Sequence, residues 1–175
     1  MSGRYPAALT ASRALLRLLI VLNLLFGALI LALLVCSFLA EGWLFEALGA
    51  RPGGGENPML IPAMRALMLV GLCSVPLAHV VLTRLLAIVA SVGRGDPFVA
   101  DNAARLQTIA WALLGLELLH LAAGAIAALA STPEDPLDIG WSFSVTGWLA
   151  VVLLFVLARV FDQGARMRDD LEGTV

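Results

Sequence analysis

Four long stretches of the chain are almost entirely apolar, and short segments rich in glycine, proline and charged residues separate them. Each stretch is long enough to cross a bilayer, since a spanning helix needs about 20 residues at a rise of about 1.5 Å per residue. None shows the strict alternation of apolar and polar residues that is typical of outer-membrane barrel strands. The pattern predicts an all-α integral membrane bundle of four transmembrane helices, over about residues 14–40, 63–92, 104–130 and 139–162.

The composition also indicates a membrane protein. Of the 175 residues, 61% are hydrophobic and 14% are charged, whereas a soluble domain averages about 45–50% apolar and about 25% charged residues. A net charge of −2 and a mean hydropathy of +0.95 argue against disorder. We therefore expect a single membrane domain over residues 1–175 and exclude a soluble globular enzyme. The first apolar stretch exceeds the core of a signal peptide, about 7–15 residues, so we expect a retained helix.

The arginines predict how the helices are oriented. All 11 basic residues are arginine. Arg51 and Arg65 fall on one side of the predicted spans, and the other nine fall on the side that holds both termini and the middle loop: Arg4, Arg13, Arg17, Arg84, Arg94, Arg105, Arg159, Arg166 and Arg168. The positive-inside rule then places both termini, including a tail over residues 163–175, in the cytoplasm.

Two segments on the predicted cytoplasmic side are candidate contact surfaces for a soluble partner. In the middle turn, Asp96 followed by Pro97 has the form of an N-cap with proline at the first helical position. We expect the tail to continue the fourth helix, so that Asp162, at the end of the predicted span, and Arg166 are spaced for an i,i+4 ion pair. A plain helix start and a solvated tail would account for the same residues. The candidate contact residues are Arg94, Asp96, Pro97, Phe98, Asn102, Arg166, Arg168, Asp169 and Asp170.

The same two segments carry a family resemblance. The turn with Gly95, Pro97, Phe98 and Asn102, the following segment 105–111, and the ending over 164–175 resemble a bacterial family of small four-helix integral membrane proteins, catalogued as a domain of unknown function. Members of that family are often encoded beside a small Xre/Cro-type helix-turn-helix regulator. The resemblance implies a multi-pass protein of the bacterial cytoplasmic (inner) membrane, and a cytoplasmic helix-turn-helix regulator as its partner.

Polar side chains inside the predicted spans form a candidate intramembrane site, because ionisable groups in hydrocarbon are costly. They are Asn23, His79, Arg84, Glu117 and His120. The two histidines are expected about 3 Å to either side of the bilayer midplane, at 1.5 Å per residue. Glu117 and His120 are spaced i,i+3 and share a helix face. Pro76 is expected to kink the second helix near His79.

Three interpretations of these polar residues remain open. They could form hydrogen bonds between helices, worth about 0.6 kcal/mol each, and no cofactor is then expected. His79 and His120 could instead ligate a b-type haem or, with Glu117 as third ligand, a transition metal. The third interpretation is a proton or ion path through Glu117 and His120 to Arg84.

The sequence favours a non-enzymatic sensor or regulatory membrane protein, with the lipid bilayer and a cytoplasmic protein as its partners. No glycine-rich phosphate loop or nucleophile–base spacing supports catalysis. The mildly basic cytoplasmic side argues against direct binding of nucleic acid. The alternatives are a redox bundle that uses His79 and His120, and a small proton- or ion-conducting protein. Small residues over 122–128 could pack within the bundle or form a homodimer interface.

Overall fold

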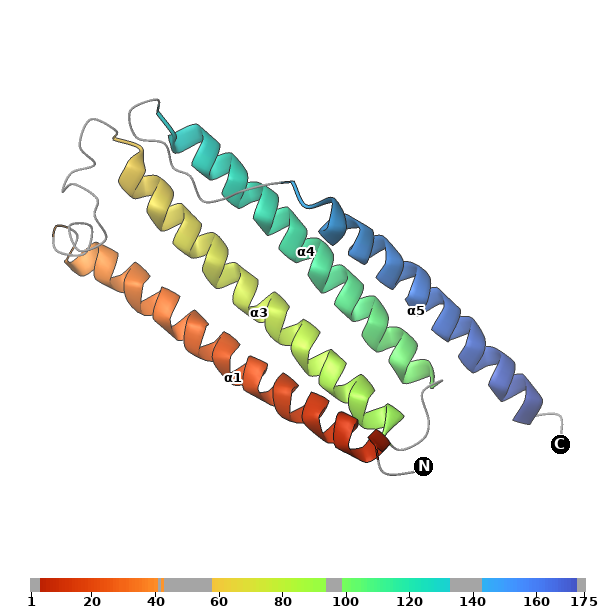
Figure 1. Cartoon of the computed structure of the whole chain (residues 1–175). Coiled ribbons are helices and arrows are strands. Elements are labelled where there is room, and N and C mark those ends of the chain that lie inside the picture. The colour runs from red at the N-terminus through yellow and green to blue at the C-terminus, as the bar shows by residue number, and fades with distance from the viewer. Residues whose placement is uncertain (1–3, 41, 43–57, 94–98, 133–142, 173–175) are drawn as a thin grey trace. The chain divides into compact units, whose positions relative to one another are not determined.

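The computed structural model describes residues 4–40, 42, 58–93, 99–132 and 143–172, with side chains described between residues 9 and 168 of these ranges. Within them all regular structure is helical (Figure 1). The helices are α1 (Arg4–Leu39), α3 (Leu60–Val92), α4 (Ala100–Ala130) and α5 (Val145–Glu172). Each is long and apolar enough to cross a membrane. The prediction of an all-α protein with four membrane-spanning helices is confirmed.

The helix ends refine the predicted boundaries. α4 begins at Ala100, directly after Val99; Asp96 and Pro97, where the sequence predicts a helix start, lie outside the described ranges. α5 begins at Val145, where the backbone N–H of Gly147 donates to Ser144 Oγ at 3.1 Å. A serine in this position satisfies an amide that has no partner within the helix.

The chain forms two compact units. The first unit contains Met1–Asn23, Leu77–Leu116 and Ser144–Val175, and the second contains Leu24–Pro76 and Glu117–Phe143. α1, α3 and α4 therefore each contribute one part to either unit, whereas α5 belongs to the first alone.

The first unit is packed around the beginning of α4. Ile109 is 2% exposed and Ala110 is fully buried, whereas α5 contributes Val151 and Ala158 to the same core. The rings of Trp111 and Phe155 meet edge to face, with centroids 5.2 Å apart. Such aromatic pairs add about 0.5–1.5 kcal/mol beyond the area that they bury. α4 and α5 are thus directly packed against each other in this unit.

The second unit depends on small residues. A Cβ added at Gly27 of α1 would lie 2.9 Å from Cγ1 of Val75 of α3, which shows how closely the two backbones approach. Ala63 of α3 and Ala127 of α4 are also buried. Small residues at helix contacts allow this close approach, which is how helices in membranes gain van der Waals contact.

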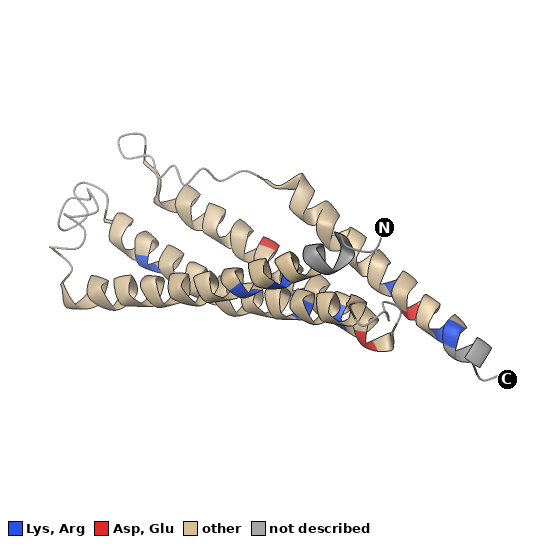
Figure 2. Ribbon diagram, turned by 60° about the horizontal axis from the view of Figure 1, so that its bottom comes forward, with Lys and Arg blue, Asp and Glu red and all other residues tan. Residues whose placement is uncertain are grey.

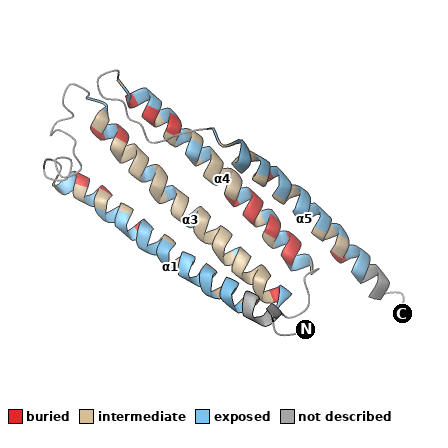
Figure 3. Cartoon of the chain, viewed as in Figure 1, coloured by how far each residue is buried: buried red, intermediate tan, exposed pale blue. Residues whose placement is uncertain are grey.

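Large apolar side chains cover the outer surface of the described helices. On α1, Leu25 is 61% exposed and Phe26 is 57% exposed, and α5 exposes Val152 and Leu153 to a similar degree (Figure 3). Charged residues are sparse along the same helices (Figure 2). A soluble protein would not expose so much apolar surface, whereas a bilayer covers it with acyl chains.

Candidate functional site

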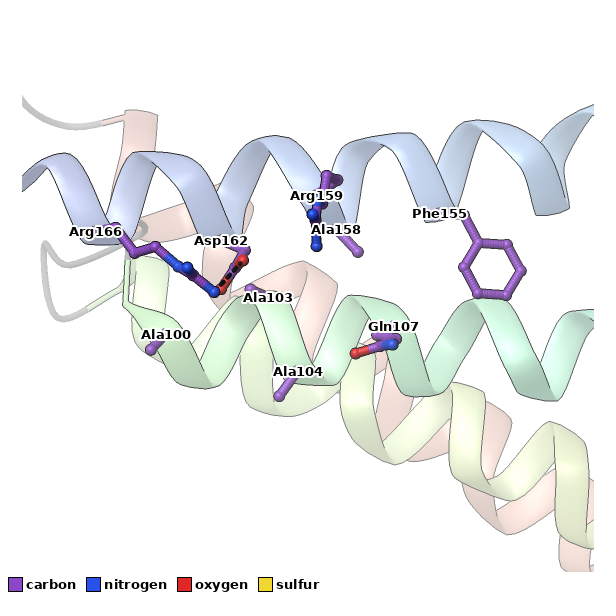
Figure 4. A pocket seen from close by; sticks show the side chains of 9 residues that line it. All are labelled: Ala100, Ala103, Ala104, Gln107, Phe155, Ala158, Arg159, Asp162 and Arg166. Carbon is purple, nitrogen blue, oxygen red and sulfur yellow. Dashed lines mark ion pairs between the residues drawn. The ribbon is translucent and has the colours of Figure 1, made fainter.

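A cavity of about 460 Å³ lies between α4 and α5 in the first unit (Figure 4). Its lining consists of Ala100, Ala103, Ala104 and Gln107 from α4 and of Phe155, Ala158, Arg159, Asp162 and Arg166 from α5. The residues from each helix are three or four positions apart and therefore share one helix face. Most of the lining residues of α4 are alanines, whose short side chains leave the space open.

The polar groups of this cavity differ in their partners. Arg166 and Asp162 form an ion pair with Nη2 and Oδ2 3.0 Å apart, as predicted from their spacing. Neither Arg159 nor Gln107 makes a hydrogen bond or an ion pair with the part of the chain that the structure describes. Figure 4 shows Arg159 directed from α5 into the space between the helices, on the side where Gln107 lies. The cavity thus contains one uncompensated positive charge.

Beside this cavity, a buried polar network joins α3 to α4. The side chain of Asn102 is fully buried, and its Nδ2 donates to Ser91 Oγ of α3 at 2.7 Å. Arg105 donates from Nη1 to Asn102 Oδ1 at 2.8 Å and forms an ion pair with Asp101 at 3.1 Å. Asn102 is one of the predicted partner-contact residues, and in this structure its side chain is fully buried. Its side chain fixes the two helices around the middle turn.

The other candidate contact residues are placed as follows. Arg166 and Arg168 lie on α5 and are exposed, with 74% of the Arg166 side chain accessible. α5 continues as a helix through Asp169 and Asp170, whose side chains lie outside the description. The remaining candidates in the middle turn also fall outside the described residues: Arg94, Asp96, Pro97 and Phe98.

The intramembrane polar residues belong to different units. His79 lies in the first unit, and Nδ1 of its imidazole is buried without a hydrogen-bond partner. Asn23, half-buried on α1, and Arg84, exposed on α3, belong to the same unit. Glu117 and His120 lie in the second unit, where Glu117 is half-buried and His120 is exposed. The pairing of the two histidines therefore stays a prediction.

The donor set for a metal is limited. Within the described ranges, no three side chains among His, Cys, Asp and Glu are close enough to hold a metal ion together. His79 belongs to the first unit, whereas Glu117 and His120 belong to the second, so the three-ligand site of these residues stays a prediction. Axial ligation of a haem needs only two histidines, and that interpretation also stays a prediction.

Pro76 lies inside α3, which continues as a helix on both sides of it.

Arg65 forms a second polar cluster, at the junction of α1 and α3 in the second unit. Its guanidinium donates to the carbonyl oxygen of Ser37 and, at 3.4 Å, to Ser37 Oγ. The same group lies over the ring of Phe38, with Cζ 4.3 Å from the centroid. These hydrogen bonds and the cation–π contact stabilise the positive charge of Arg65 close to apolar surface, and they join the two helices.

Sequence reasoning missed the α4–α5 cavity, although one signal for it was present. The sequence marks Arg159 as an orientation signal, and no motif marks Gln107. Phe155, Arg159, Asp162 and Arg166 recur at helical spacing, and so do the alanines of α4. Two such faces on helices that are adjacent in sequence could have indicated a shared polar space.

Comparison with known proteins identifies the family. The family described as "Protein of unknown function (DUF2975)" matches residues 50–175, which is most of the chain. The chain belongs to this family, which confirms the resemblance to a small membrane family of unknown function. No curated protein and no solved structure matches the chain.

Proposed function

We propose that this member of the DUF2975 family is a non-enzymatic regulatory membrane protein that holds a cytoplasmic partner through the end of α5. The observation that supports this most directly is the length of α5, which remains helical to Glu172, well beyond the predicted span that ends near residue 162. A regular helix outside the membrane is a rigid support for side chains that contact another protein.

The end of α5 has a packed face and an accessible face. Ala165 is 4% exposed, so this part of the helix is held against its own unit. Arg166, which is paired with Asp162, and Arg168 are both exposed on the accessible face of the helix. Because the helix is already ordered, binding a partner would not incur the loss of conformational entropy that folding this segment would cost.

The partner in this proposal is a small cytoplasmic helix-turn-helix regulator. The support for it is the family resemblance, in which such a regulator is often encoded beside the membrane protein. Sequestering a repressor at the membrane would remove it from DNA, and a signal that weakens the contact would release it.

Co-purification tests this proposal. The tagged full chain would be extracted from membranes together with its co-expressed encoded neighbour. We expect Arg168→Glu to lower the recovered neighbour on the order of tenfold, because a reversed charge at an interface is repulsive. The matched control is Arg17→Glu, an exposed arginine of α1 on the same predicted side. If the intact chain recovers no neighbour, or if both variants reduce recovery equally, the proposal fails.

One observation supports a second candidate function, a haem-binding redox protein. Nδ1 of His79 is buried without a partner, and buried polar atoms normally have one. An imidazole nitrogen without a hydrogen-bond partner can serve as the axial ligand of a haem iron. The absorption spectrum of the purified protein tests the candidate: a Soret band that is lost in His79→Leu supports it, and a spectrum without one rejects it.

A further inference from the structure

We propose that the cavity between α4 and α5 binds the phosphate of an anionic phospholipid headgroup, with Arg159 as its main ligand. This proposal is independent of the regulatory partner. It begins from the space itself, since about 460 Å³ lies between the two helices and a phosphate with part of a glycerol backbone fits within such a volume.

The charges of the cavity fit an anion. Asp162 is already paired with Arg166 at 3.0 Å, so these two charges largely compensate each other. Arg159 has no partner among the described residues and projects into the cavity (Figure 4). Its guanidinium presents N–H groups in a planar fork that matches two phosphate oxygens.

The remaining lining complements this role. The amide of Gln107, which is also without a partner, offers two further N–H donors from the opposite helix. The α4 side of the cavity is lined by short side chains, which leave room for a headgroup: Ala100, Ala103 and Ala104. Phe155 provides an apolar wall on α5, where the headgroup would give way to the acyl chains.

The position along the helices favours a lipid as the source of the phosphate. α5 carries no charged residue from Val145 to Ala158, so Arg159 stands where the apolar part of the helix ends. On α4, the charged residues Asp101 and Arg105 likewise precede a long uncharged stretch. The cavity is therefore at headgroup depth, on the side that the arginines predict to be cytoplasmic, where basic pockets between membrane helices recruit anionic lipids.

Native mass spectrometry of the detergent-purified full chain would test the proposal. Phosphatidylglycerol is titrated in one arm, phosphatidylcholine in a second, and inorganic phosphate is added as competitor in a third. We expect one phosphatidylglycerol to bind in preference to phosphatidylcholine. Arg159→Gln should weaken its binding about tenfold, because it removes charge-assisted hydrogen bonds, and Arg159→Lys should restore part of the affinity.

Two controls keep the outcome specific. Arg17→Gln removes an exposed arginine of α1 that does not line the cavity and should leave binding within about twofold. Ala104→Leu fills the cavity without changing any charge and should weaken binding, whereas Ala14→Leu, on the exposed surface of α1, should not. Circular dichroism confirms that each variant keeps its helices.

Three results would overturn the proposal. Equal loss in the Arg159 and Arg17 variants would mean that the lipid is attracted only by diffuse positive charge. Unchanged binding in Ala104→Leu would place the lipid outside the cavity. Full displacement of the lipid by millimolar inorganic phosphate would assign the site to free phosphate.

Discussion

At the scale of single residues, the polar groups of this chain that are buried in the described units mostly have partners on a second helix. Asn102 of α4 contacts Ser91 of α3, and Arg65 of α3 contacts Ser37 of α1. A polar side chain that is buried without a partner destabilises the folded state, because it loses its hydration and gains no hydrogen bond in return. Each of these contacts therefore favours one helix arrangement over others. Such side chains join the helices more selectively than apolar contacts, which many arrangements could satisfy.

Asn102→Ala should therefore destabilise the protein by about 1–3 kcal/mol, because it leaves Ser91 and Arg105 without their buried acceptor and donor. The thermal midpoint in detergent, followed by circular dichroism, should fall by about 2–4 °C per kcal/mol. Thr108→Val is the control, since the Thr108 hydroxyl only donates to the carbonyl of Ala104 in its own helix. A midpoint for Asn102→Ala that equals the control would show that the network contributes nothing.

At the scale of helices, close approach depends on what faces each glycine. The Cβ of an alanine at Gly27 would meet Val75, whose branched side chain has little rotamer freedom. An alanine at Gly115 would approach Leu77 Cδ1 at the same 2.9 Å, but that atom is the end of a flexible side chain. Equal distances therefore predict unequal consequences.

We expect Gly27→Ala to lower stability by about 1–3 kcal/mol through overpacking. Gly115→Ala should be neutral or stabilising, because Leu77 can move away and alanine favours the helix by about 1 kcal/mol over glycine. Thermal midpoints of the two variants, measured in the same detergent, check this order. A lower midpoint for Gly115→Ala than for Gly27→Ala would contradict it.

The sequence was sufficient to predict the helices but not their lateral contacts. Uninterrupted apolar stretches identify spans because the bilayer imposes a length, and the i,i+4 spacing identified the pair of Asp162 with Arg166. The contact of Asn102 with Ser91 was not accessible in the same way, since periodicity tells which face a residue occupies but not which helix it meets. The role of Arg159 in the cavity could not be predicted either, because an arginine at the end of a span is already explained by the positive-inside rule.

At the scale of the whole molecule, the arginine distribution makes a prediction about orientation that the helices alone do not. Nine arginines lie on one side of the four predicted spans and two on the other. Translocating a cluster of positive charges is disfavoured, so the side with nine should remain in the cytoplasm. Four spans, an even number, then bring the C-terminus to the same side as the N-terminus.

Reporter fusions check this orientation. Green fluorescent protein fused after Val175 should fluoresce, because it folds in the cytoplasm, and alkaline phosphatase at the same position should be inactive, because it needs disulfides that form outside. Alkaline phosphatase inserted after Thr132, between α4 and α5, should be active. An active phosphatase after Val175 would reverse the orientation, and the exposed arginines at the end of α5 would then face away from any cytoplasmic regulator. The orientation is thus the condition on which the regulatory proposal depends, whereas phosphate binding by Arg159 could be measured in either orientation.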